Sequence, residues 1–184
     1  RKLALYVKNI LNEARMEEGR FRIEKRPIAL RELASDAAAS VSALLAQKGI
    51  KLSMEMPPRP VLVDADREAL ALVVSNLLGN AVKYTRQGGS ITVRIAHHPG
   101  APGSVVFSVE DSGIGISLED MKRITMGFYR SEDGRAQAEG FGLGLRISNQ
   151  LLALHGSRLE ISSEKGKGSC FFFELPAAAE EGGR

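Results

Sequence analysis

Residues 105–116 combine an expected strand with a turn that could recognise a flat ring bearing an amine. The strand VVFSVED ends in Asp111, and Ser-Gly-Ile-Gly-Ile follows at 112–116. A carboxylate buried at a strand end can accept a hydrogen bond from an exocyclic amine. Glycine at positions 113 and 115 lets a ring approach the backbone closely. An ordinary strand-to-helix turn has the same composition, so this motif alone leaves both interpretations open.

Residues 140–145, Gly-Phe-Gly-Leu-Gly-Leu, open a helix expected over 143–155. Three glycines expose backbone N–H groups at the start of that helix, where unpaired amides and the helix dipole favour phosphate. The spacing is neither Gly-x-Gly-x-x-Gly nor the P-loop pattern, and no other segment supplies either, which disfavours both of those nucleotide sites. Gly-Lys-Gly-Ser at 166–169 is typical of a hairpin turn.

A polar stripe runs along the helix expected over residues 66–84. Asn76, Asn80, Lys83 and Tyr84 fall on one side of it, at about 100° per residue, and they flank its apolar face. A stripe at the edge of a buried face is well placed to line a cleft, and asparagine is a poor helix former that needs a reason to be there. The solvated side of an ordinary helix would look the same.

The elements that position these motifs follow from hydrophobic periodicity. Helical spacing recurs over 1–18, 28–48, 66–84 and 143–155, with Asp66 as a candidate N-cap. Strands are expected at 51–56, 60–65, 91–97, 105–111, 158–164 and 169–175. Ser117 and Asp120 are expected to cap a short helix. Successive strands with tight connections predict an α/β (α+β) two-layer sandwich: a mixed, mostly antiparallel sheet with helices on one face.

Composition excludes several classes of protein. One cysteine in 184 residues rules out a disulfide-stapled scaffold, and no apolar run reaches the length of a membrane helix. A net charge of +3, with 5% aromatic residues, gives no sign of nucleic-acid binding. The chain begins at Arg1 inside an expected helix, which suggests a fragment of a longer protein.

The order of the motifs is far more specific than any one of them. Asn-x-x-x-Asn-x-x-Lys-Tyr is followed by Asp-x-Gly-x-Gly, Gly-x-Gly-x-Gly and Gly-x-Gly. With this order, the chain resembles the catalytic ATP-binding domain of two-component sensor histidine kinases, in the superfamily of gyrase B, Hsp90 and MutL. The resemblance covers about residues 28–176. It implies the Bergerat-type fold, with ATP as substrate and Mg²⁺ as metal.

The resemblance also implies a role for each motif residue. Asn80 would offer its amide oxygen to Mg²⁺, Asn76 would support the metal or a phosphate, and Lys83 would pair with phosphate oxygens; these would be the catalytic residues. Tyr84 would lie against adenine or ribose, and Asp111 would accept a hydrogen bond from the adenine amine. The other nucleotide-binding residues would be Gly113, Gly115, Ile116, Phe128, Tyr129, Arg130, Arg135, Gly140, Phe141, Gly142, Leu143, Gly144, Leu145 and Ser169, with residues 127–139 forming a lid.

The partners follow from the same resemblance. Residues 1–20 resemble the C-terminal end of the last helix of the dimerisation and histidine-phosphotransfer domain. Residues 21–27 would be a linker, and 177–184 a disordered tail. His97, His98 and His155 lack the flanking residues of the acceptor and are expected to be structural or solvated. A partly positive ring at His155 would suit a helix end.

The implied function is transfer of the γ-phosphate of ATP to a histidine on a dimerisation domain absent from this fragment. A response-regulator receiver domain would act downstream. The full-length protein is expected to be a homodimer, and this domain is expected to lie in the cytoplasm. Anchoring of the parent protein in the inner or plasma membrane is compatible with that location. Without the whole dimerisation domain, the fragment is compatible with a monomer.

Two other functions stay open. An ATPase of the same superfamily would need the water-activating Glu that its members carry near position 76, and an amide cannot take that proton. A non-enzymatic module is compatible with Thr125 and Met126, because the family usually has Ile-Phe before the lid and this chain has Ile124-Thr125. Retention of the other nucleotide-contacting positions favours the kinase.

Overall fold

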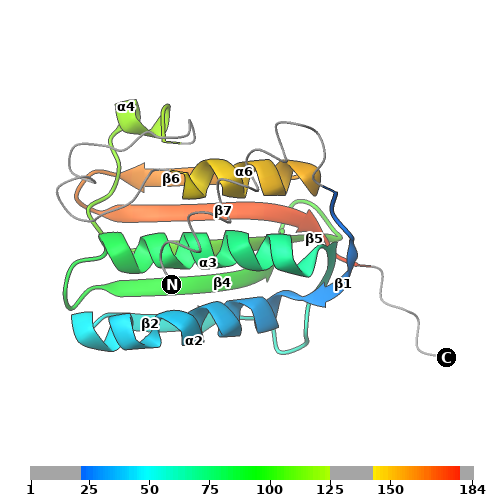
Figure 1. Ribbon diagram of the computed structural model, residues 1–184, viewed down its shortest axis with the longest axis horizontal. Helices are drawn as coiled ribbons and strands as arrows, with labels where there is room; N and C mark the ends of the chain where they lie inside the picture. The colour runs from blue at the N-terminus through cyan, green and yellow to red at the C-terminus, as the bar shows by residue number, and fades with distance from the viewer. Residues whose placement is uncertain (1–21, 125–142, 179–184) are drawn as a thin grey trace.

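The computed structural model describes residues 22–124 and 143–178 (Figure 1). Its elements, in chain order, are β1 (Arg26–Ala29), α2 (Leu30–Lys48), β2 (Lys51–Glu55), β3 (Leu62–Ala65), α3 (Arg67–Tyr84), β4 (Ser90–His97), β5 (Ser104–Asp111), α4 (Leu118–Met121), α6 (Gly144–Leu154), β6 (Glu160–Glu164) and β7 (Gly168–Pro176). The expected helix at 1–18 and the lid at 127–139 lie outside the described residues. No helix among the described residues is long and apolar enough to cross a membrane.

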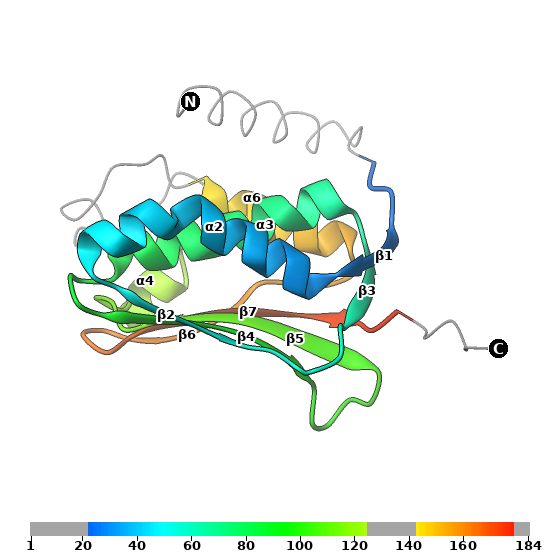
Figure 2. The same ribbon diagram turned by 90° about the horizontal axis from the view of Figure 1, so that it is seen from below.

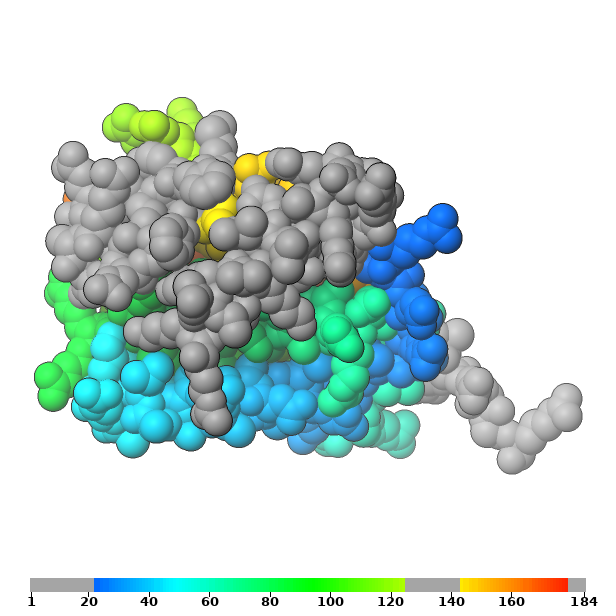
Figure 3. Space-filling model, in the orientation of Figure 1, coloured from blue at the N-terminus to red at the C-terminus, as the bar shows by residue number. Residues whose placement is uncertain are grey.

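The main sheet has the order β2-β4-β5-β7-β6. Only the β2–β4 pair is parallel, and the other neighbours are antiparallel. Helices α2, α3 and α6 lie together over one face of this sheet (Figure 2). In the space-filling view, α2 follows one edge of the helical face and α4 protrudes at the opposite edge (Figure 3). The predicted two-layer sandwich with a mixed sheet is confirmed.

The short strands at one end of the domain differ from the prediction. β3 does not pair with β2, the strand before it in the chain; it pairs instead with β1 in a separate two-stranded sheet. The expected linker therefore ends in a strand, and the helix predicted from residue 28 begins at Leu30. Two residues of the expected tail are held as well, since Ala177 bridges Val63 and the N–H of Ala178 donates to Leu62.

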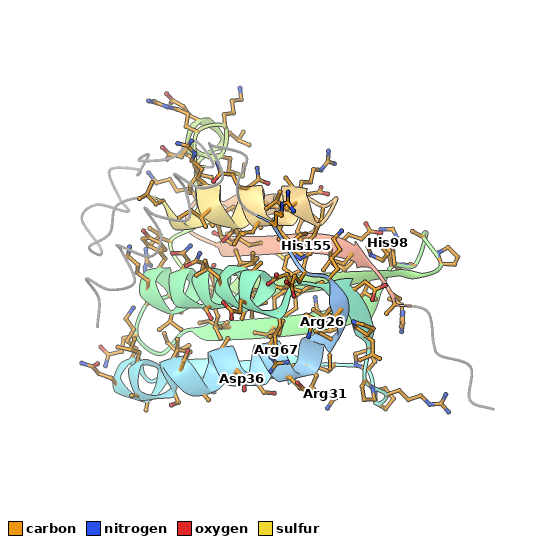
Figure 4. All side chains as sticks on the ribbon, turned by 45° about the vertical axis from the view of Figure 1, so that its right-hand side comes forward. Arg26, Arg31, Asp36, Arg67, His98 and His155 are labelled. Atoms are coloured by element: carbon orange, nitrogen blue, oxygen red, sulfur yellow. The ribbon has the colours of Figure 1, made fainter. Side chains whose placement is uncertain are left out.

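The core lies between the helices and the inner face of the sheet. Helix α3 is central, with eight buried apolar side chains on one face, and it packs against both α2 and α6. Phe107 on β5 and Phe173 on β7 stack beneath it with ring centroids 5.2 Å apart. Arg67 at the start of α3 reaches Asp36 on α2 (Figure 4), but these exposed charges contribute little stability.

Asp66 joins three segments at the start of α3. Its carboxylate accepts the N–H of Ala69 at 3.0 Å, as expected for an N-cap, and also the N–H of Glu24 at 2.9 Å. Its own N–H donates to Nε2 of His155 at 3.0 Å, and Nδ1 of that ring lies 2.7 Å from the carbonyl oxygen of Leu151. An accepting Nε2 and a donating Nδ1 require a neutral imidazole. His155 is therefore structural, as predicted, but the expected partly positive ring was wrong.

Asp66→Ala is expected to lower the free energy of unfolding by about 1–2 kcal/mol, the usual loss for a helix N-cap. Burial alone would raise the pKa of Asp66, but hydrogen bonds from the backbone of Ala69, Glu24 and Glu68 hold it below its usual value. A depressed pKa means that this stabilisation is present near neutral pH and is lost as the pH falls through the folded-state pKa. Urea unfolding at pH 7 and pH 3 measures both effects. Asp64→Ala, an exposed residue on β3, is the control; a loss equal to that of the control would contradict the assignment.

Candidate functional site

The alternation of β5 places Asp111 at the end of the buried face of the sheet. Val105, Phe107 and Val109 point into the core, and Asp111 is the next residue on that face, with 6% of its surface exposed. In register, Asp111 lies between Ile91 of β4 and Ser169 of β7. The predicted carboxylate at a strand end is thus both buried and directed to the side on which the helices lie.

Burial strongly perturbs this carboxyl group. Desolvation raises the pKa of Asp111 to about 6, while hydrogen bonds from the backbone of Gly113 and Ser169 lower it and the neighbouring charge of Glu110 raises it. The N–H of Gly113 donates to its Oδ1 at 2.8 Å. A largely ionised carboxylate held out of water at neutral pH is suited to accept hydrogen bonds from a ligand, since doing so offsets its desolvation.

The turn after Asp111 packs directly on the β6–β7 hairpin. A Cβ on Gly115 would lie 2.0 Å from the carbonyl oxygen of Glu164, and a Cβ on Gly168 would lie 1.9 Å from that of Asp111. Both glycines also have positive φ, at 64° and 120°. The N–H of Gly166 donates to the carbonyl oxygen of Ile114 at 2.7 Å. Only glycine allows the backbones to approach this closely.

The polar stripe of α3 flanks the buried face of that helix, as predicted. Asn76 and Asn80 are both partly buried, between the fully buried positions and the exposed Ser75. The side-chain nitrogen of Asn76 donates to the carbonyl oxygen of Gly144 and to Oγ of Ser148, both at 3.3 Å. Asn76 therefore ties α3 to the first turn of α6, and its carboxamide oxygen takes part in neither bond.

The last turn of α3 lies against the Asp111 turn. The carbonyl oxygen of Tyr84 accepts the N–H of Ile114 at 3.3 Å, and a Cβ on Gly113 would lie 2.6 Å from the same oxygen. Nζ of Lys83 lies 4.8 Å from the centre of the Tyr84 ring, a distance at which a cation is attracted to the ring. The structure thus brings the end of α3 and the Asp111 turn together, with Asn76 linking α3 to α6.

The predicted site is described only in part. Leu143 and Leu145 are buried at the start of α6, with Gly144 between them. Seven predicted nucleotide-binding residues lie outside the described residues: Phe128, Tyr129, Arg130, Arg135, Gly140, Phe141 and Gly142. Ile116 uses its N–H to donate to Oγ of Ser163 at 2.9 Å.

Sequence reasoning missed Ser163 on β6. Its hydroxyl donates to the carbonyl oxygen of Gly168 at 2.8 Å, so it must accept from Ser169, whose Oγ lies 2.9 Å away. Together with the bond from Ile116, this fills the hydrogen-bonding capacity of Ser163 and fastens the Asp111 turn to the hairpin. The one signal in the sequence was the alternation of the strand, which places Ser163 on the same face as the apolar Ile161.

Comparison with known proteins gives one consistent family. Residues 65–179 match the family described as histidine kinase-, DNA gyrase B- and HSP90-like ATPase. The chain belongs to this ATPase family. Its resemblance to the catalytic ATP-binding domain of sensor histidine kinases is thereby confirmed.

Relatives of the family agree in sequence and fold. The adaptive-response sensory kinase SasA of Crocosphaera subtropica is 33% identical over 170 residues, which cover 92% of this chain and 44% of that protein. The structure of full-length ShkA in complex with AMPPNP has a TM-score of 0.83 and 30% identity, covering 96% of this chain and 36% of that one. The catalytic domain of the histidine kinase ThkA has a TM-score of 0.73 and 26% identity, covering 84% of this chain and 96% of that one. The chain spans less than half the length of the curated relative.

Asp111→Asn is expected to change how the stability of this ATPase domain depends on pH. The raised pKa of Asp111 means that the folded wild type binds a proton more tightly than the unfolded chain, so this group destabilises the fold as the pH rises from about 4 to 7. Asparagine does not titrate, so the variant lacks this pH-dependent contribution to stability. The unfolding free energy of the variant, relative to wild type, should therefore rise by up to ~3 kcal/mol across that range, at 1.36 kcal/mol per pKa unit.

Urea unfolding at half-unit pH intervals measures this difference. Altered hydrogen bonding in the variant would change its unfolding free energy by the same amount at every pH. It therefore does not affect how the difference from wild type changes with pH. Asp64→Asn, at an exposed position on the same domain, should show no such rise. A difference between Asp111→Asn and wild type that stays flat with pH would contradict the burial of a charged carboxylate.

Proposed function

We propose that this chain is the catalytic domain of a sensor histidine kinase, which binds ATP with Mg²⁺ and delivers the γ-phosphate to a histidine of a dimerisation domain. The observation that carries the proposal is the buried Asp111 carboxylate, held beside the last turn of α3 by the Tyr84–Ile114 hydrogen bond. Adenine offers an exocyclic amine to such an acceptor. A site built to bond that amine discriminates strongly against rings that lack it.

Asn76 favours transfer to a protein over hydrolysis. A water-activating residue must accept a proton, and a carboxamide cannot do so at neutral pH. The nitrogen of Asn76 is moreover engaged with Gly144 and Ser148, which orients its oxygen. Phosphoryl transfer depends mainly on positioning and charge neutralisation, and Lys83 at the end of the same stripe supplies a positive charge for phosphate oxygens.

The residues present fit a magnesium ion held jointly with the nucleotide. Among residues 22–124 and 143–178, no three His, Cys, Asp or Glu side chains cluster so that they could hold a metal. Asn80, one turn after Asn76, offers a neutral oxygen, and Mg²⁺ is commonly bound by few protein ligands together with substrate phosphates. When bound, the ion would neutralise charge on the phosphates. Asn80 would orient it, and Lys83 would hold the phosphate chain.

The acceptor histidine must belong to another segment of the parent protein. Both ring nitrogens of His155 are engaged inside the fold. Nδ1 of His98 accepts the N–H of Gly100 at 3.1 Å in the loop between β4 and β5, and His97 is exposed at the end of β4. Neither His97 nor His98 touches the site residues described above. A homodimer of the parent protein and a response-regulator partner complete the proposal.

The test is phosphate transfer in trans. The chain is incubated with radiolabelled ATP, Mg²⁺ and the separately expressed dimerisation domain of the parent protein, and acid-labile, base-stable label on that domain is measured. Asn80→Ala should lower the rate at least about tenfold, the usual scale for loss of a residue that supports a metal site. Asn149→Ala is the matched control, because it removes an amide on α6 that bonds Leu159 away from the stripe.

Two outcomes would overturn the proposal. Release of inorganic phosphate without labelled histidine would indicate an ATPase. Saturable ATP binding without either product would indicate a non-enzymatic nucleotide-binding module.

A further inference from the structure

The end of helix α3 is closed by a lysine from another helix. Lys48, the last residue of α2, directs its ammonium group at the final turn of α3. Nζ donates to the carbonyl oxygens of Val82 at 2.8 Å, Lys83 at 3.0 Å and Thr85 at 3.0 Å. An ammonium group has three N–H donors, so all three are used on one helix end.

These bonds complete the satisfaction of that helix terminus. The last four carbonyl groups of a helix have no partner within it. Here the oxygen of Ala81 accepts the N–H of Thr85, and the oxygen of Tyr84 accepts the N–H of Ile114. Between these two residues in the chain, the carbonyl oxygens of Val82 and Lys83 accept hydrogen bonds from Lys48. Every carbonyl from 81 to 85 therefore has a donor, and Lys48 supplies three of the five.

The junction is partly shielded from water. Thr85 is fully buried and Lys48 is partly buried. The backbone around it is also tied down, because the N–H of Gly88 donates to the carbonyl oxygen of Lys48 at 2.9 Å. A positive charge at a helix C-terminus is favourable, and more so when partly buried. Loss of the ammonium group would leave three carbonyl groups at this partly buried helix end without these donors, which is unfavourable.

We propose that Lys48 is a positioning residue for the nucleotide site. The turn that it caps carries Lys83 and Tyr84, and the Asp111 turn rests on that same backbone through Ile114 and Gly113. Among the described residues assigned to the nucleotide, Lys48 hydrogen-bonds only to Lys83, and only to its backbone carbonyl oxygen. It fixes the distance between the α3 stripe and the buried carboxylate. This inference rests on the proposed ATP-binding function.

Lys48→Met keeps most of the aliphatic stem and removes the donors. Titration calorimetry is expected to show ATP affinity lowered about tenfold, equivalent to 1.4 kcal/mol. Amide hydrogen exchange at Ile114 should quicken, because its acceptor on Tyr84 is no longer held. Lys51→Met, three residues away and exposed on β2, makes the same charge change and should leave both measurements at the wild-type value.

A second control separates positioning from general loss of stability. Val63→Ala opens a cavity at a fully buried position on β3, in the two-stranded sheet that β3 forms with β1. It should lower the melting temperature without changing ATP affinity or exchange at Ile114. If Lys48→Met does not fold, Lys48→Arg is the variant to measure. Arginine keeps the charge and the donors, but its planar guanidinium cannot match three converging acceptors, so we expect an intermediate loss of affinity.

The outcomes distinguish this inference from the function on which it rests. A folded wild-type chain that binds no ATP would overturn the proposed function. Wild-type binding with unchanged affinity in the folded Lys48 variants would overturn the role of Lys48. An affinity loss that Val63→Ala reproduces at equal melting temperature would do the same.

Discussion

The close contact between the Asp111 turn and the β6–β7 hairpin is the constraint on which the candidate site depends. At Gly115 and Gly168 a single Cβ would overlap a backbone carbonyl oxygen, at 2.0 Å and 1.9 Å. The contact leaves Asp111 with 6% of its surface exposed and places its turn under the last residues of α3. Because folded backbones are close-packed and cannot yield at such contacts, a larger residue at either glycine would move the carboxylate itself.

A buried carboxylate has a consequence for the whole domain. Burial raises the pKa of Asp111 to about 6, so the ionised carboxylate lowers the stability of the fold relative to an uncharged residue in the same position. A ligand amine that bonds the carboxylate recovers part of this energy. The rest of the fold supports Asp111. β4 and β7 flank it in register, while Ser163 and Lys48 donate to carbonyl groups of the β6–β7 hairpin and of the end of α3. Functional sites commonly sacrifice local stability in this way.

The sequence predicted elements with strong periodicity better than it predicted pairings. Helix α3, its Asp66 cap and its polar stripe followed from helical spacing, and the Ser117 cap followed from its partner three residues on. The pairing of β1 with β3 could not be predicted, since strands of four residues carry little pattern. The neutral state of His155 and the bonds of Lys48 depend on partners distant in sequence, which periodicity does not encode. Glycine spacing indicated where backbone approach would occur, but not that the hairpin is what approaches.

The role of Asp111 in base recognition is tested most directly by comparing the affinity of this chain for ATP and for inosine triphosphate, which replaces the adenine amine with an oxygen. If Asp111 accepts a hydrogen bond from that amine, calorimetry should show ATP bound at least about tenfold more tightly, since a buried acceptor is left facing another acceptor in the inosine complex. Asp111→Asn should remove most of this preference. Equal affinity of the wild-type chain for the two nucleotides would contradict the assignment of Asp111 as the group that recognises the base.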